Sequence, residues 1–317
     1  MDFSAQMCKS CLNIITKIVI FTAAIVCSST ASLNVITSIP DIADIAKEIG
    51  RDSVSVFSLA QGNEDYHMIR ARSSFLPKIN RANLVICLGL EAENRWLVPI
   101  IEAARNSYVQ QGHPGWIEAY RGIEVLEKPL TLQSDNPHIA GHRLGNPHIN
   151  EGPYSGKIIA KNIYEAFVRE EQKNQAMYAK NYQEYSKKLD AMELRLKQKA
   201  APLNNVHVIS YHADLAYFCH FYGMVITGCL EPQPGIPPNS RHCAKLILDA
   251  QRDHVQLVLY HQAQNPQLPE KIAKRIGARE VCFANMVNSR KEIHTFIELQ
   301  EYNLEIMLAA VAGENKR

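Results

Sequence analysis

The chain has 317 residues, a formal net charge of +2, 46% hydrophobic residues and 21% charged residues. This composition is typical of a folded globular protein and argues against extensive disorder. The small net charge and the absence of a long Lys/Arg run do not favour nucleic-acid binding, and the length allows two domains.

The amino terminus has the three parts of a secretory signal peptide. Lys9 and Lys17 precede an apolar run over residues 18–27, and small residues follow at positions 28–32. A positive region, an apolar region and a small-residue cleavage site in this order are typical of a cleavable leader. We therefore predict a signal peptide over residues 1–31.

Two alternatives concern the fate of this leader. A membrane anchor needs about 20 apolar residues, and the run is shorter than that. Lipid attachment at Cys27 is a minority alternative, since Val26 is bulky where a lipidated cysteine usually follows a small residue. We predict cleavage near Ala31 and an exported, periplasmic and soluble mature protein.

The cysteines give no metal-binding pattern. Three of the eight lie in the predicted leader, and five remain, at Cys87, Cys219, Cys229, Cys243 and Cys282. One disulfide could form among these five in an oxidising compartment, which leaves at least one thiol. We expect most of them to be buried small hydrophobic residues.

From residue 33 onward, strand and helix patterns alternate. The predicted strands of the first half are residues 33–38, 53–59 and 84–89, and the predicted helices are 40–49, which Gly50 ends, 74–81 and one that begins near Glu91. Strands separated by helices predict a parallel sheet with both faces covered. Residues 112–152 are rich in Pro, Gly, His and Asn, and we expect an irregular region with one strand near 122–126.

The longest helical pattern extends from Ser155 to Lys199. Apolar and aromatic residues recur mostly at three- and four-residue steps, and Pro202 follows the end. The spacing is not a regular heptad, which argues against a coiled coil. We predict one continuous helix of roughly 65 Å that spans the molecule and joins two α/β lobes.

The second half repeats the alternation. The predicted strands are residues 206–211, 224–230, 255–260 and 281–284, and the predicted helices are 213–222, 240–252, 269–276 and 293–312. Neither half contains a phosphate-binding Gly-rich loop or a nucleophile elbow. The predicted fold is therefore α/β, with a first lobe over 33–152, a linking helix over 153–201 and a second lobe over 203–317.

Four of the twelve histidines lie where a site could form. His67 is in a loop after a first-lobe strand, His148 precedes the long helix, and His212 and His261 end strands of the second lobe. Because ligands of open α/β sheets gather outside the carboxyl ends of strands, all four can converge in a cleft between the lobes. Neutral imidazoles suit Zn²⁺. The alternative is four unrelated surface or core histidines, since no two of them form a short His-x-x-x-His pair.

The irregular region holds further histidines, among them His138 and His142. Asn-Pro-His occurs at residues 136–138 and again at 146–148. We prefer His148 as the ligand, because it adjoins the long helix and would be held rigidly. Whether His138 or His142 takes part is left open.

The chain resembles the metal-binding substrate-binding proteins of zinc and manganese ABC importers, from about Leu33 to Ala312. The matching stretches are residues 35–43, 64–67, 82–91, 145–148, 211–213, 230–236 and 303–305. The resemblance implies two α/β lobes joined by one long helix, with a divalent metal bound in the cleft. It also implies a partner, the membrane permease to which the metal is delivered.

The resemblance assigns His67, His148 and His212 as nitrogen ligands. A histidine at the third place, where other members have a carboxylate, is similar to the zinc branch, and imidazole favours Zn²⁺ whereas oxygen ligands favour Mn²⁺. Where the family usually has an acidic residue near the end of the penultimate strand, this chain has Asn285. The fourth position is therefore open to His261, Glu64, Asn285 or water.

We accordingly predict a monomeric exported protein that binds Zn²⁺, with Mn²⁺ less favoured, and hands it to an ABC permease without catalysing a reaction. We expect the affinity to fall below about pH 6 as the histidines become charged. One alternative is a zinc hydrolase with Glu64 as its general base. Another is a degenerate relative that acts as an adhesin or interaction protein, which the neutral Asn285 motivates.

Overall fold

The computed structural model describes residues 32–128, 143–232 and 236–314. The predicted signal peptide, Cys27, His138 and His142 lie outside the described residues. In the part of the chain that is described, no helix has both the length and the apolar character needed to cross a membrane.

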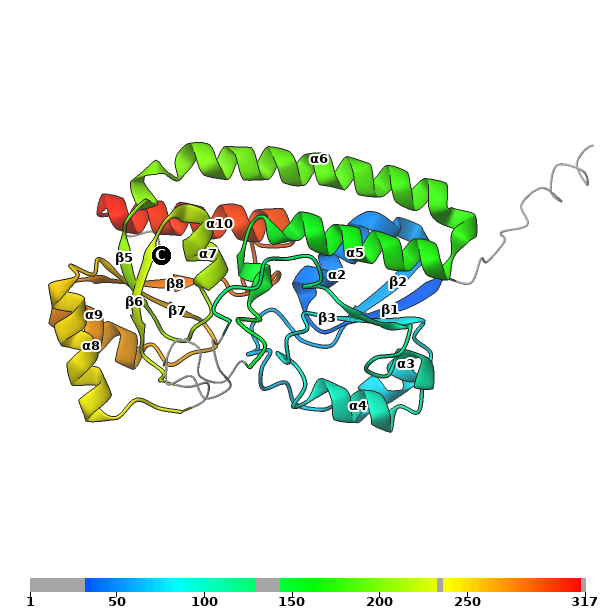
Figure 1. Ribbon diagram of the computed structural model, residues 1–317, viewed down its shortest axis with the longest axis horizontal. Coiled ribbons are helices and arrows are strands. Elements are labelled where there is room, and N and C mark those ends of the chain that lie inside the picture. The colour runs from blue at the N-terminus through cyan, green and yellow to red at the C-terminus, as the bar shows by residue number, and fades with distance from the viewer. Residues whose placement is uncertain (1–31, 129–142, 233–235, 315–317) are drawn as a thin grey trace, which may run out of the picture. The chain divides into compact units, whose positions relative to one another are not determined.

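Two parallel sheets of four strands each form the framework (Figure 1). The first sheet has the order β2-β1-β3-β4 and consists of β1 (Leu33–Thr37), β2 (Val54–Ser58), β3 (Leu84–Cys87) and β4 (Trp116–Glu118). The second has the order β6-β5-β7-β8 and consists of β5 (His207–Ser210), β6 (Val225–Cys229), β7 (Leu257–His261) and β8 (Arg279–Phe283). The predicted fold class, two α/β lobes with parallel sheets, is confirmed.

Helices connect the strands and surround both sheets. In the first half they are α2 (Pro40–Gly50), α3 (Leu76–Asn80) and α4 (Leu97–Ala103), followed by α5 (Ser155–Glu170) and α6 (Gln175–Lys199). In the second half they are α7 (Ala216–Tyr222), α8 (Ser240–Arg252), α9 (Gln267–Ile276) and α10 (Phe296–Ala312). Each parallel connection therefore crosses outside its sheet, which leaves the carboxyl ends of the strands to the loops.

The predicted single helix over 155–199 is wrong in one respect, because the chain reverses in its middle. Glu171 has φ −142° and ψ 71°, and a short 3-10 helix, Gln172–Asn174, follows it before α6 begins. The Glu171 carboxylate accepts hydrogen bonds from Asn174 Nδ2 (2.8 Å) and Tyr178 Oη (2.7 Å), which stabilises the turn. Helices α5 and α6 pack side by side (Figure 1). The long helix between the lobes is thus α6 alone, with 25 residues.

One strand and the start of one helix in the first half also differ from prediction. No strand forms at 122–126; the fourth strand is β4, which pairs with β3, while the Leu126 amide donates to Tyr217 Oη of α7. The helix expected from Glu91 begins at Leu97, because Leu90 and Glu91 have positive φ values of 54° and 66°. A left-handed backbone at two successive residues cannot continue into a right-handed helix.

Gly50 does not follow the helix as predicted. It lies inside α2, and the residue with positive φ is Arg51, at 45°. A side chain at residue 50 would meet the Val54 side chain at 2.2 Å. The glycine is therefore required by close packing against β2.

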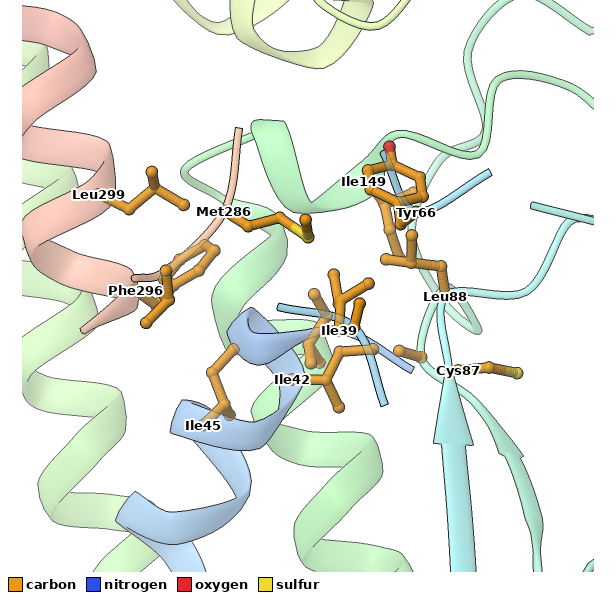
Figure 2. Packing of buried hydrophobic residues seen from close by; sticks show 14 of the residues in the cluster. Ile39, Ile42, Ile45, Tyr66, Cys87, Leu88, Ile149, Met286, Phe296 and Leu299 are labelled. Carbon is orange, nitrogen blue, oxygen red and sulfur yellow. The ribbon is translucent and has the colours of Figure 1, made fainter. Parts of the chain in front are cut away.

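One hydrophobic cluster extends through both halves of the described chain. Figure 2 shows Ile42 and Ile45 of α2 close to Met286 and Phe296, which follow β8. All four side chains are buried. The segment after β8 is therefore packed onto the first lobe, and this contact fixes the carboxyl ends of the two sheets relative to one another.

Two carboxyl groups of α2, the buried Asp41 and the half-buried Asp44, take part in this contact. Asp41 Oδ2 accepts the Val287 amide (3.3 Å), and Asp44 Oδ2 accepts the Phe296 amide (2.8 Å). Burial raises the pKa of Asp41 to about 7 and that of Asp44 to about 6. The carboxyl groups thus supply acceptors for one amide in the segment after β8 and for the first amide of α10.

None of the five cysteines outside the predicted leader, all of which are described, forms a disulfide. Cys87, Cys219 and Cys229 are buried, as expected, and Cys243 and Cys282 are half-buried. The disulfide that the sequence allowed does not form.

Candidate metal centre

Three histidines from separate segments meet between the two sheets. His67 lies in the loop after β2, His148 lies directly before a 3-10 helix that precedes α5, and His212 follows β5. One ring nitrogen of each lies within 4.8 Å of the others, and no other such group of His, Cys, Asp or Glu occurs in the described residues. Ring centroids are 5.0, 5.1 and 5.5 Å apart, with interplanar angles of 68–70°. The rings therefore surround one point almost symmetrically.

The orientation of His148 is fixed by its neighbour Asn146. His148 Nδ1 lies 2.7 Å from Asn146 Oδ1, which can only accept, so Nδ1 carries the proton. The Asn146 amide cannot be reversed, because its Nδ2 donates to Glu127 Oε2 (2.8 Å) and to the Ala213 carbonyl (2.7 Å). His148 Nε2 is consequently the nitrogen with a lone pair, and it faces the centre.

His67 follows the same rule. Its Nδ1 lies 3.3 Å from the Ala92 carbonyl oxygen, an acceptor, so Nδ1 is protonated and Nε2 has the lone pair. The Nε2 atoms of His67 and His148 are 2.9 Å apart. Two lone pairs that face one another are stabilised by a cation between them. Nitrogens bound to tetrahedral zinc are roughly 3.4 Å apart, given a Zn–N length of about 2.0–2.1 Å, so a shift of about 0.5 Å would admit the ion.

His212 is oriented by a carboxylate. Its Nδ1 lies 3.4 Å from Glu231 Oε2, which directs Nε2 toward the other two histidines. Burial lowers the pKa of His212, but the hydrogen bond to Glu231 and the charge of Asp214 outweigh burial, and the net shift is upward. Burial, followed by the charge of His212, lowers the pKa of His67 to about 4, so His67 is neutral at pH 7. An imidazole that is neutral at this pH can bind a metal without first losing a proton.

A cavity of about 220 Å³ contains the triad. Four carboxyl groups also line it, and they belong to Asp65, Glu151, Asp214 and Glu231. Burial raises the pKa of Glu151, and it raises the pKa of Asp214 to about 7. The described lining contains a single cationic side chain, Arg95. The arrangement suits a small cation rather than an anion.

The residues expected to compete for the fourth position lie in different environments. His261 lines the cavity, but its Nδ1 accepts the Ala263 amide (3.3 Å), which puts the proton on Nε2, 3.9 Å from Asp214 Oδ2. Coordination through Nε2 would require that proton to move and the bond to Ala263 to break. His261 is not part of the group within 4.8 Å.

The two oxygen candidates are engaged by other groups. The Glu64 carboxylate forms an ion pair with Arg72 (2.5 Å), accepts the Gln61 amide (2.7 Å) and does not line the cavity. Asn285 does line it, but its Oδ1 accepts from Gln262 Nε2 (2.9 Å) and its Nδ2 donates to the Glu64 carbonyl (3.2 Å). Asn285 thus ties the loop after β8 to the loop that carries His67.

Sequence reasoning missed two residues that orient the triad. Glu231 follows β6, which pairs with β5, so the strand-end argument that selected His212 also applies to Glu231. Asn146 lies two residues before His148, a spacing at which an Asn side chain commonly accepts a backbone amide, as it does here at 3.0 Å. Glu231 could therefore have been found from its position at the end of a strand, and Asn146 from its turn-forming spacing to His148.

The chain has clear relatives. The family ZnuA, described as zinc-uptake complex component A, periplasmic, matches residues 35–310. The high-affinity zinc uptake system protein ZnuA of Bacillus subtilis is 23% identical, over 87% of this chain and 86% of its own length. The manganese ABC transporter substrate-binding lipoprotein PsaA of Streptococcus anginosus is 26% identical, over 62% of each chain.

Solved structures share the fold. A crystal structure of ZnuA has a TM-score of 0.72 and 23% identity, and the match covers 88% of this chain and 99% of that one. A Cd-bound periplasmic metal-binding protein of Candidatus Liberibacter asiaticus also has a TM-score of 0.72, with 20% identity and coverage of 87% and 98%. The arrangement of two sheets with α6 between them is therefore one already seen in metal-binding proteins.

Proposed function

The chain belongs to the ZnuA family, and we propose that it captures Zn²⁺ through Nε2 of His67, His148 and His212 and delivers the ion to an ABC permease. Members of this family are metal-binding substrate-binding proteins of ABC transporters and not enzymes. The zinc hydrolase alternative is therefore not retained. Its nominated base, Glu64, is moreover held by Arg72 away from the cavity.

The observation that carries the proposal is the matched orientation of three rings. Each Nδ1 faces an acceptor outside the triad, namely the Ala92 carbonyl, Asn146 Oδ1 and the Glu231 carboxylate. Metal-bound histidines commonly use one nitrogen for the ion and donate from the other in this way. Three converging lone pairs from neutral imidazoles are a zinc-type donor set.

The choice of zinc over manganese rests on the donor atoms. Relatives of this chain are named for zinc and for manganese. Manganese is bound preferentially by oxygen, and zinc by nitrogen and sulfur. With three nitrogens converging in the described site, Zn²⁺ is the preferred cargo, and His261 or a water molecule can supply a fourth donor. Export through the leader, and function as a monomer, are parts of the same proposal.

Metal titration of purified, metal-free protein tests the proposal. The triple variant His67→Ala, His148→Ala, His212→Ala should lose at least 100-fold in zinc affinity, measured by competition with a chelator of known affinity. The matched control is His220→Ala, His254→Ala, His294→Ala, which removes three exposed histidines outside the cavity. An unchanged affinity in the first variant would contradict the proposed site.

The transport role needs a cellular measurement. A strain that lacks this protein should grow poorly when zinc is chelated, and the wild-type gene should restore growth, as should added zinc. The triad variant, expressed at the same level, should fail to restore it. If purified wild-type protein binds no metal more tightly than millimolar, the alternative of an adhesin or interaction protein is favoured instead.

A further inference from the structure

Glu231 is held beside His212 by the backbone of the second sheet. Strands β5 and β6 pair in parallel, with Ser210 opposite Cys229. The hydrogen bonds continue beyond the strands, since the Leu230 amide donates to the Ser210 carbonyl (2.9 Å) and the Glu231 amide donates to the Tyr211 carbonyl (2.8 Å). Position 231 is therefore fixed relative to position 212 by main-chain bonds and does not depend on a loose loop.

The two side chains interact away from bulk water. Glu231 Oε2 lies 3.4 Å from His212 Nδ1, and the side chains are 17% and 8% exposed, respectively. A charge pair that is partly removed from water interacts more strongly than one on the surface. Since a carboxylate can only accept, the contact places the proton on Nδ1 and leaves Nε2 to the metal.

We propose that Glu231 is the positioning residue of this metal site, holding His212 in the Nδ1–H tautomer and supplying a negative charge next to the bound cation. The inference rests on the proposed function and deepens it. His67 and His148 have uncharged acceptors at Nδ1, a carbonyl and an amide oxygen. Glu231 thus gives the second lobe an anionic group in the cavity, to which Asn285 contributes only an amide.

Other acids of the cavity fit this role less well. Asp214 Oδ2 has a different imidazole as its neighbour, with 3.9 Å to His261 Nε2. Asp65 Oδ1 accepts the His67 amide (2.9 Å) and supports the first-lobe loop. Glu231 Oε2, in contrast, contacts Nδ1 of His212, the ring nitrogen that a metal bound at Nε2 would leave protonated.

Two substitutions separate charge from orientation. Glu231→Gln keeps an acceptor for Nδ1–H but removes the charge, and Glu231→Met removes both while preserving size. Outer partners of ligand histidines typically change metal affinity by about 10–100-fold. We expect a loss of zinc affinity in that range for Glu231→Met and a smaller loss for Glu231→Gln. The matched control is Glu118→Gln, a half-buried glutamate that ends β4 and pairs with Arg121.

A second measurement reports on the tautomer directly. In metal-free protein, imidazole nitrogen NMR shifts should show His212 as the Nδ1–H tautomer in wild type and in Glu231→Gln, and as a mixture in Glu231→Met. A side chain that only stabilised the fold would lower the unfolding temperature without changing the tautomer. Unfolding should therefore be recorded for each variant.

Failure of the role proposed for Glu231 can be distinguished from failure of the three-histidine zinc site. If wild type binds zinc and Glu231→Met binds within twofold of it with an unchanged tautomer, the role of Glu231 is contradicted and the three-histidine site stands. If neither wild type nor the variants bind zinc, the proposed function itself fails. If Glu118→Gln weakens binding as much as Glu231→Met, the effect is general to the fold and Glu231 has no special role.

Discussion

Each triad histidine has one ring nitrogen in contact with a group outside the triad, and these groups come from three different segments: the turn after β3, the residues before α5 and the end of β6. The outer contacts decide which nitrogen faces the centre. A neutral histidine has one protonated nitrogen, so fixing the proton on Nδ1 fixes the lone pair on Nε2. At the scale of single residues, the metal site is therefore set as much by Asn146 and Glu231 as by the histidines.

The triad histidines should titrate at different pH values. The pKa of His212 is raised above its usual 6.5, because Glu231 and Asp214 outweigh burial, whereas burial lowers the pKa of His67 to about 4. As pH falls, His212 should gain a proton before His67 does, and zinc affinity should begin to fall at a higher pH than the value near 6 expected from ordinary histidines. His67 should remain neutral until pH approaches 4.

Histidine NMR of the metal-free protein, recorded from pH 8 to pH 4, checks this order. The resonances of His212 should move with a midpoint above 6.5, and those of His67 should still report a neutral ring at pH 5. The exposed His254 serves as an internal reference in the same spectra. A His67 midpoint near 6.5 would contradict the structural account.

At the scale of elements, the reversal between α5 and α6 is the clearest departure from the pattern in the sequence. The segment 168–177 lacks the regular apolar steps present on either side, and Asn174 and Tyr178 stabilise Glu171 in its non-helical conformation. Propensity alone permits a helix through these residues. The interhelix packing of α5 on α6 favours the turn.

Replacing Glu171 tests the importance of that turn. Glu171→Ala removes the acceptor of two hydrogen bonds to side chains, and we expect the free energy of unfolding to fall by about 1–3 kcal/mol. Urea unfolding followed by circular dichroism measures the change. Glu165→Ala, at an exposed position of α5, is the control and should change stability by less than about 0.5 kcal/mol. Equal stability of the two variants would show that the turn is set by packing alone.

At the scale of the whole molecule, the contact between α2 and the segment after β8 joins the two lobes and includes the buried Asp41 and the half-buried Asp44. Asp44 accepts the Phe296 amide, and burial raises its pKa from 3.8 to about 6. The native state thus binds a proton at Asp44 at pH values where the unfolded chain has released it. Stability contributed by this group is complete below about pH 4 and is lost as pH rises through 6.

Asp44→Asn should remove this dependence. The amide keeps an oxygen that can accept the Phe296 N–H, and it has no charge to bury. Above pH 6 the variant should be more stable than wild type by up to about 3 kcal/mol, given 1.36 kcal/mol per pKa unit. Denaturant unfolding from pH 3.5 to pH 8 gives the comparison, with exposed Asp52→Asn as the control. If the free energies of unfolding of Asp44→Asn and wild type differ by the same amount at every pH, the raised pKa of Asp44 is contradicted.

Three features of this protein could be predicted from its amino-acid sequence: the alternation of strands and helices, the two parallel sheets, and the positions of His67, His148 and His212 near strand or helix ends. These features follow from local periodicity and from the rule that loops at the carboxyl ends of parallel strands meet. The end of α2 before Arg51, the start of α4 at Leu97 and the position of β4 could not be predicted in this way. Left-handed residues and the choice of an edge strand depend on neighbours that are distant in the sequence.

The details on which metal binding depends arise only in the folded chain. The 3.4 Å contact of Glu231 with His212 requires the register of β5 and β6, and the 2.9 Å approach of His67 to His148 joins residues 81 positions apart. Proton positions on the imidazoles follow from these contacts. A histidine in a sequence shows that nitrogen ligands are available, and its folded neighbours determine which nitrogen is presented to the ion.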